Sequence, residues 1–88
     1  MYGVVWKVRL EVSDFQTVML PWGARALSVG VQHGEVMLWA EVDPDERMAE
    51  FPVFIQGTGH NPQSGRGPYV GSFMLDDGKF VGHVFVED

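Results

Sequence analysis

Hydrophobic and polar residues alternate along most of the chain. Between Val4 and Val12 every second side chain is apolar, at Val4, Trp6, Val8, Leu10 and Val12, and shares one face, while Lys7, Arg9 and Glu11 share the other. Alternation with a period of two is typical of a β-strand with one buried face. The same pattern predicts about seven strands, over residues 4–12, 16–20, 25–32, 35–42, 50–57, 69–75 and 79–87.

Short turn sequences separate these strands. Pro21-Trp22-Gly23 is typical of a tight turn, because proline fixes φ and glycine accepts a positive φ. His33-Gly34 predicts a two-residue hairpin turn, and Asp76-Asp77-Gly78 predicts the last hairpin. Antiparallel strands joined in this way predict an all-β domain, either a β-sandwich or a partly open barrel.

Three features interrupt the alternation. Asp43-Pro44-Asp45-Glu46 has the residues of a helix N-terminus, so at most one short helical turn is expected near residues 43–49. Residues 58–68 are rich in glycine and proline and predict a mobile loop. Pro52 predicts that strand 50–57 lies at a sheet edge or carries a bulge, since proline cannot donate to a ladder.

Length and composition limit the domain organisation. The chain has 88 residues, of which 45% are hydrophobic, so we expect one domain over residues 1–88 with one core. The absence of cysteine excludes disulfides, cysteine-bound zinc and thiol nucleophiles. No run approaches the ~20 apolar residues of a membrane span, and residues 1–12 do not resemble a signal peptide. We therefore expect a cytoplasmic protein that does not bind a membrane.

The charge changes the expected partners. The formal net charge is −6, which disfavours direct binding of a phosphate backbone. Acidic residues gather in one segment, and this segment is either a solvated loop or a patch that docks on a basic protein surface. Its acidic members are Glu41, Asp43, Asp45, Glu46 and Glu50.

Several strands carry apolar side chains on both faces. Both faces of such a strand need cover, which comes either from the same monomer or from a partner. Exposed apolar patches mark protein interfaces, and tryptophan is enriched among interface anchors. The candidate interface residues are Trp39, Phe54 and Phe85, with Trp22 from the first turn.

No catalytic or metal-binding constellation is legible in the sequence. His33, His60 and His83 are not paired at ligand spacing, although His60 and His83 would form a candidate site if they shared a cleft. A nucleophile elbow, a dinucleotide fingerprint and a phosphate loop are all absent. We therefore expect a protein that is not an enzyme and that uses no cofactor or metal.

Several short motifs occur in a fixed order. They are Leu20-Pro21-Trp22-Gly23-Ala24, Val31-Gln32-His33-Gly34, Leu38-Trp39-Ala40-Glu41-Val42-Asp43, Gly57-Thr58-Gly59-His60, and Tyr69-Val70-Gly71-Ser72-Phe73 with His83-Val84-Phe85. In this order and spacing they resemble a family of small tailed-bacteriophage and prophage proteins, a domain of unknown function. The resemblance covers roughly residues 8–87. It implies that the protein acts in a phage or prophage setting, and it implies no catalytic residues.

Two functional hypotheses follow from these observations. The first is an accessory protein that acts by protein–protein binding and inhibits or redirects a bacterial host factor, such as a defence nuclease or polymerase, in the host cytoplasm. The alternative is a virion-associated structural protein, for example a decoration or tail accessory protein that packs against virion subunits or other copies of itself. Each hypothesis requires a protein partner, and only the second requires self-association.

Overall fold

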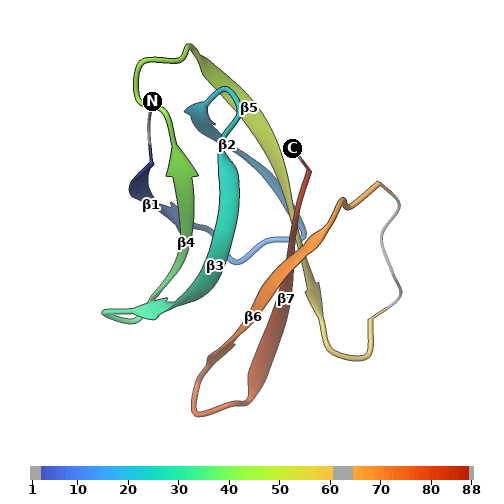
Figure 1. Cartoon of the computed structure of the whole chain (residues 1–88). Helices are drawn as coiled ribbons and strands as arrows, with labels where there is room; N and C mark the ends of the chain where they lie inside the picture. The colour runs from blue at the N-terminus through green and yellow to red at the C-terminus, as the bar shows by residue number, and fades with distance from the viewer. Residues whose placement is uncertain (1–2, 61–64, 88) are drawn as a thin grey trace.

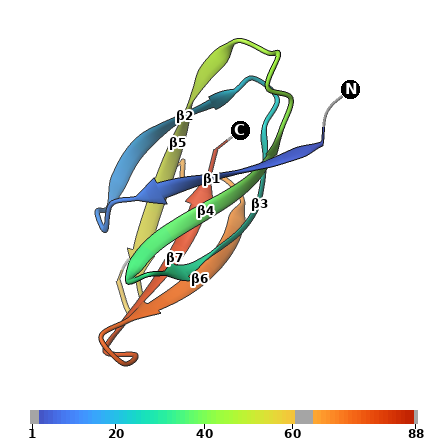
Figure 2. The same cartoon turned by 90° about the vertical axis from the view of Figure 1, so that its left-hand side faces the viewer.

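The computed structural model describes residues 3–60 and 65–87, which form seven antiparallel strands in two sheets (Figure 1). One sheet has the order β1-β4-β3 and the other has the order β2-β5-β7-β6. The sheets lie against each other as the two layers of a sandwich and are not joined into a barrel (Figure 2). The strands are β1 (Val4–Leu10), β2 (Phe15–Pro21), β3 (Arg25–Gln32), β4 (Glu35–Val42), β5 (Met48–Gly57), β6 (Tyr69–Leu75) and β7 (Phe80–Val86).

Both predicted hairpins are confirmed. His33 and Gly34 join β3 to β4 with φ values of 53° and 80°, and positive φ at both central residues gives the turn a twist that matches the strands. The β6–β7 turn places Asp76, Asp77 and Gly78 in the same left-handed region, at φ of 54°, 56° and 85°. Aspartate and glycine tolerate this conformation better than most residues.

The segment near residues 43–49 forms a tight turn, and the described residues contain no helix. The Asp45 backbone N–H donates to Asp43 Oδ1 (3.0 Å), and the Glu46 N–H donates to the Asp43 carbonyl (3.1 Å). The chain then extends at once, because the Arg47 carbonyl accepts the Trp22 N–H at 2.7 Å and prolongs the β2–β5 ladder. Residues that could cap the N-terminus of a helix therefore cap a single tight turn here.

The prediction that Pro52 marks an edge strand or a bulge is wrong. Strand β5 lies between β2 and β7, and its register with β2 is continuous. Pro52 is tolerated because it lies where β7 ends. Its carbonyl accepts the Glu87 N–H at 3.0 Å, and the N–H that proline lacks would have faced the last residue of that ladder.

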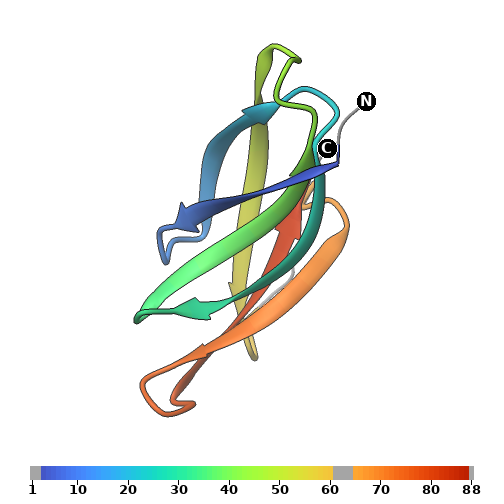
Figure 3. The same cartoon turned by 60° about the vertical axis from the view of Figure 1, so that its left-hand side comes forward.

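Strand β3 differs from its predicted alternation. A register shift between Ala26 and Ser28 places Leu27 in a bulge. The alternation of Leu27, Val29 and Val31 predicts that all three face inward, whereas Leu27 is 42% exposed and Val31 is 41% exposed. The edge strands β3 and β6 run side by side and close one side of the sandwich without a shared ladder (Figure 3). Gly71 allows this approach, because a Cβ there would lie 3.0 Å from Val29 Cγ2.

Both sheets contribute inward side chains to one core cluster. Leu38 from β4, Val53 from β5 and Val84 from β7 are completely buried. Beside them, Gly82 pairs with Phe73 on β6, and the phenyl ring lies over the glycine. The space that a side chain at Gly82 would occupy is thus already filled.

We predict that Gly82→Ala destabilises the fold by about 1–3 kcal/mol, as overpacking does in dense cores. The new Cβ would lie 2.5 Å from Phe73 Cζ and 3.1 Å from Ile55 Cγ2. The matched control is Gly30→Ala, whose Cβ would lie at an ordinary 3.5 Å from Trp39 Cζ3 and should not destabilise. Urea denaturation of both variants measures the difference, and equal midpoints would contradict this account of the core.

Candidate binding surfaces

An aromatic row crosses the outer face of the four-stranded sheet. Phe15 on β2 is the register partner of Phe54 on β5, Phe54 is the partner of Phe85 on β7, and Phe85 is the partner of Tyr69 on β6. Register partners share a face of a sheet, so these four rings lie together on the side away from the core. We call these four residues the aromatic row.

The two ends of the row are open to solvent. Phe15 is 52% exposed and Tyr69 is 58% exposed, while Phe54 and Phe85 are partly buried between them. The ring centroids are 5.0 Å apart for Phe15–Phe54, in a tilted arrangement, and 5.5 Å apart for Tyr69–Phe85, in an edge-on arrangement. Tilted and edge-on contacts are favourable between aromatic rings, so each end ring packs against its inner neighbour while more than half of its surface stays open to solvent.

Arg66 lies against the row. Its guanidinium carbon is 4.2 Å from the centre of the Phe85 ring, and Nη1 donates to Gln56 Oε1 at 2.6 Å. The Gln56 amide in turn donates to the His60 carbonyl at 2.9 Å. Stacking on an aromatic face is a favourable position for arginine, and the glutamine holds the cation there.

A chain of hydrogen bonds runs beside the aromatic row. Thr58 Oγ1 bonds His83 Nε2 at 2.8 Å, His83 Nδ1 bonds Ser72 Oγ at 2.7 Å, and Ser72 Oγ bonds the Tyr69 hydroxyl at 2.7 Å. Hydroxyl groups thus occupy both ring nitrogens of His83, whereas a catalytic histidine of the serine-hydrolase type has a carboxylate on one of them. We interpret this chain as the support that fixes Tyr69 at the end of the row.

The other sheet covers part of its second apolar face within the monomer. Trp39 lies over Gly30, which has no side chain to displace it, and Met37 is only 8% exposed. Lys7 Nζ on β1 donates to Gln32 Oε1 on β3 at 2.6 Å, and this bond spans β4 on the Met37 side of Trp39. Polar side chains from the flanking strands therefore lie over Met37, while Trp39 stays partly exposed.

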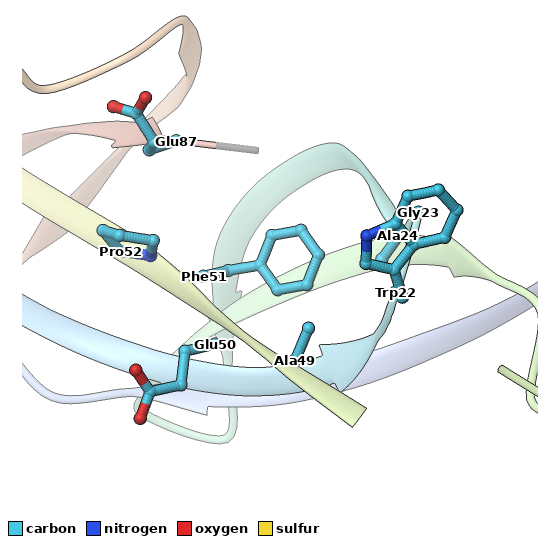
Figure 4. Close-up of a pocket in the computed structure, with 8 residues that line it drawn as sticks. All are labelled: Trp22, Gly23, Ala24, Ala49, Glu50, Phe51, Pro52 and Glu87. Carbon is cyan, nitrogen blue, oxygen red and sulfur yellow. The ribbon is translucent and has the colours of Figure 1, made fainter. Parts of the chain in front are cut away.

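Trp22 projects from the β2–β3 turn and is 54% exposed. The Arg47 guanidinium lies 6.0 Å from the centre of its indole ring. Trp22 borders a hollow of about 440 Å³, and Figure 4 shows the Phe51 ring pointing toward the indole with Glu87 across from it. We call this the Trp22 hollow; its lining residues are Trp22, Gly23, Ala24, Ala49, Glu50, Phe51, Pro52 and Glu87.

The acidic segment does not form one patch. Glu41 is on the three-stranded sheet, where one carboxylate oxygen lies 2.7 Å from Arg25 Nη2, and Asp43 uses its carboxylate to cap the turn. Asp45 and Glu46 are exposed at that turn, whereas Glu50 is on β5 in the other sheet and lines the Trp22 hollow.

The structure brings together only part of the predicted interface. Phe54 and Phe85 are neighbours in the aromatic row, whereas Trp39 lies on the other sheet and Trp22 at a turn. Sequence reasoning missed Phe15 and Tyr69, because only the strand register places them beside Phe54 and Phe85. His60 and His83 do not converge on a common site: the His60 ring packs against the buried Gly57, and His83 bonds the two hydroxyls described above.

Residues 3–60 and 65–87 contain no cluster of three or more metal-ligating side chains. Within the same ranges no helix is long and apolar enough to cross a membrane. Part of the predicted loop, residues 61–64, lies outside the described residues.

Comparison with known proteins identifies the family. A family described as Domain of unknown function (DUF7352) matches residues 1–88. The chain belongs to this family. No curated protein and no solved structure matches it. The resemblance to an uncharacterised family of small proteins is thereby confirmed, and the phage origin of this DUF7352 member stays a prediction.

We predict that the aromatic row binds apolar probes in the native state. Nile red fluorescence should rise with the wild-type protein, and the double variant Phe15→Ser/Tyr69→Ser should lose most of this rise because it removes both exposed ends of the row. The control Leu27→Ser/Val31→Ser removes two apolar side chains that are 42% and 41% exposed on β3, and it should keep the rise. An equal loss of the fluorescence rise in both double variants would show that Nile red does not bind the aromatic row in preference to other exposed apolar residues.

Proposed function

We propose that this DUF7352 protein is a non-enzymatic binding module that docks on another protein through the aromatic row and thereby inhibits or redirects a bacterial host factor. One observation carries the proposal: four aromatic side chains cross an entire sheet on its outer face, and the two end rings, Phe15 and Tyr69, are more than half exposed. The host setting comes from the motif resemblance to phage and prophage proteins.

The surface favours a protein partner over nucleic acid. Interface cores combine aromatic residues, methionine and arginine, and here Met19 and Met74 are 50% and 64% exposed on the same sheet, while Arg66 stacks on the row. The interplanar angles of 56° and 61° leave no common flat platform on which bases would stack. The net charge of −6 also opposes a phosphate backbone.

The apolar row also suits contact with another copy or a virion subunit. Each copy would then bury the same row in a self-complementary interface. This alternative differs from the first in one measurable respect, since it requires the purified protein to associate with itself.

The test is site-specific photo-crosslinking in bacterial cells. A photoreactive phenylalanine at position 85 should give an adduct with one host protein, and the same residue at position 27 should not. With that protein purified, Phe85→Ser should weaken binding at least about tenfold, as loss of an interface anchor does, while Leu27→Ser should leave it unchanged.

Three results would contradict this proposal. Adducts only between copies of this chain, with an oligomer on size-exclusion chromatography, would support the virion-type alternative. Equal weakening by Phe85→Ser and Leu27→Ser would exclude the row as the interface. The absence of any adduct from position 85 would count against a partner on this face.

A further inference from the structure

Strand β2 directs the backbone groups of every second residue away from its sheet. The Ile55 N–H donates to the Asp14 carbonyl at 3.1 Å, just before this strand begins, and the register with β5 is continuous from there. In an antiparallel pair, alternate residues bond the same neighbour, so the even-numbered residues of β2 bond toward β5. The odd-numbered residues Phe15, Thr17 and Met19 therefore point their N–H and C=O groups to the outer edge.

No described strand runs along this outer edge. The four-stranded sheet ends at β2 and at β6; β6 has β3 beside it, whereas β1 and β2 diverge from the loop that joins them (Figure 2). Within residues 3–60 and 65–87, no backbone group bonds those of Thr17 or Met19 on this side, and the Ser13 hydroxyl donates to the Phe15 carbonyl at 3.3 Å. An edge with unpaired backbone groups is a template for an added strand.

The exposed side chains of β2 are uncharged. Phe15 and Met19 are 52% and 50% exposed, and Thr17 lies between them on the same face. Natural proteins commonly protect a sheet edge with charged side chains, above all lysine. The edge strand β1 carries Lys7 and Arg9, whereas β2 has no charged residue. This edge therefore lacks the charges that would reject a strand like itself.

We infer that a second copy of this chain adds its own β2 to this edge, antiparallel, across a two-fold axis at Thr17. In this register each Thr17 N–H donates to the carbonyl of the other Thr17, and Phe15 lies opposite Met19 of the second copy. All three edge-facing residues are then paired. Slipping the pairing by two residues would place Phe15 opposite Pro21, which has no N–H, or remove Met19 from the ladder.

The side chains of β2 complement those of a second copy. At each end of the paired strands the Phe15 ring would lie beside the Met19 thioether of the other copy, and sulfur–aromatic contacts are favourable. At the centre the two Thr17 side chains would be opposite each other, which is a favourable cross-strand pair. A strand rich in lysine or glutamate would find no opposite charge on β2. The self-complementary edge thus fits a copy of itself.

The net charge of −6 opposes this dimer only weakly. Along β2 and β5, the acidic residues closest across the axis would be Asp14 of one copy and Glu50 of the other, which is the register partner of Met19. They would be two strand spacings apart, about 10 Å, which is the Debye length at about 0.1 M salt. Salt should therefore strengthen the dimer, because it screens this repulsion.

The dimer goes beyond the proposed function and leaves its surface free. It would continue the four-stranded sheet into the second copy, with both aromatic rows on the same side and joined at Phe15. Phe85 on β7 is separated from β2 by β5, so copies paired in this way should not crosslink to each other from position 85. A host protein can dock on the row of either copy.

Cysteine substitution tests the register, since the chain has no cysteine of its own. Thr17→Cys would place two Cα atoms about 5.5 Å apart, within the range that a disulfide spans, so oxidised glutathione should convert the full chain to a disulfide-linked dimer. Met19→Cys is the matched control on the same strand. The two Met19 positions are offset by about 13 Å along the ladder, which is too far for a disulfide.

Sedimentation equilibrium measures the dimer without a crosslink. The wild-type chain should dimerise more tightly as salt rises. Thr17→Lys sets two like charges opposite each other and should weaken the dimer at least about tenfold. Met74→Lys makes the same change of charge on β6, at a side chain that is 64% exposed, and should leave the dimer unchanged. Circular dichroism checks that each variant keeps the wild-type fold.

Three results would overturn the inference. They are a wild-type chain that stays monomeric up to millimolar concentration, equal disulfide formation at positions 17 and 19, and equal weakening by Thr17→Lys and Met74→Lys. The first two need no folded lysine variant. If any of them occurs while crosslinking at position 85 still yields a host protein, the proposed function stands and only this inference is wrong.

Discussion

The packing of the two sheets through Leu38, Val53 and Val84 is the contact on which the rest of the structure depends. Because side chains alternate along a strand, burying these three residues determines which residues of β4, β5 and β7 point outward. The outward residues include Trp39, Phe54 and Phe85, which are as apolar as many core residues. Burying the core therefore leaves apolar side chains on the outer face of each sheet, and these side chains also need to be shielded from water.

The two sheets solve this problem differently. In the three-stranded sheet the central strand β4 has a neighbour on each side, and the Lys7–Gln32 hydrogen bond between those neighbours passes over β4. In the four-stranded sheet the row runs to both edges, where Arg66 stacks on the Phe85 ring, Ser72 bonds the Tyr69 hydroxyl, and the end rings Phe15 and Tyr69 stay exposed. An arrangement that orders an apolar surface and leaves its ends open suits a binding face, since rigid aromatic anchors lose little entropy when a partner docks.

Much of the fold could be predicted from the sequence, because strands and turns depend on local patterns. The alternation along Glu35–Val42 determines a strand, and the dipeptide His33-Gly34 determines a turn, each within a few residues. The errors arose where a distant part of the chain decides the outcome. Pro52 was taken as a sign of an edge strand, whereas its tolerance depends on where β7 ends, and Leu27 leaves the core because β3 shifts its register against β4.

The candidate site was predictable only in part, for the same physical reason. Two-sided strands drew attention to Phe54 and Phe85, and these rings do lie in one row. Phe15 and Tyr69 belong to strands that are far apart in the sequence, and no local pattern states that both are in register with β5 and β7. The acidic segment looked continuous in the sequence, but the chain passes from one sheet to the other within it and separates Glu41 from Glu50.

Strand β5 carries one ring of the aromatic row and the last bond of the described ladder with β7. Phe54 is part of the aromatic row, and the Pro52 carbonyl accepts the Glu87 N–H in the last bond of the described β5–β7 ladder. Exposed edges favour uncontrolled pairing between copies, and natural proteins oppose this with short edges, proline and charge. Two of these devices, proline and charge, occur together on β5 at Pro52 and Glu50. The strand that carries Phe54 of the aromatic row therefore also carries residues that disfavour uncontrolled pairing.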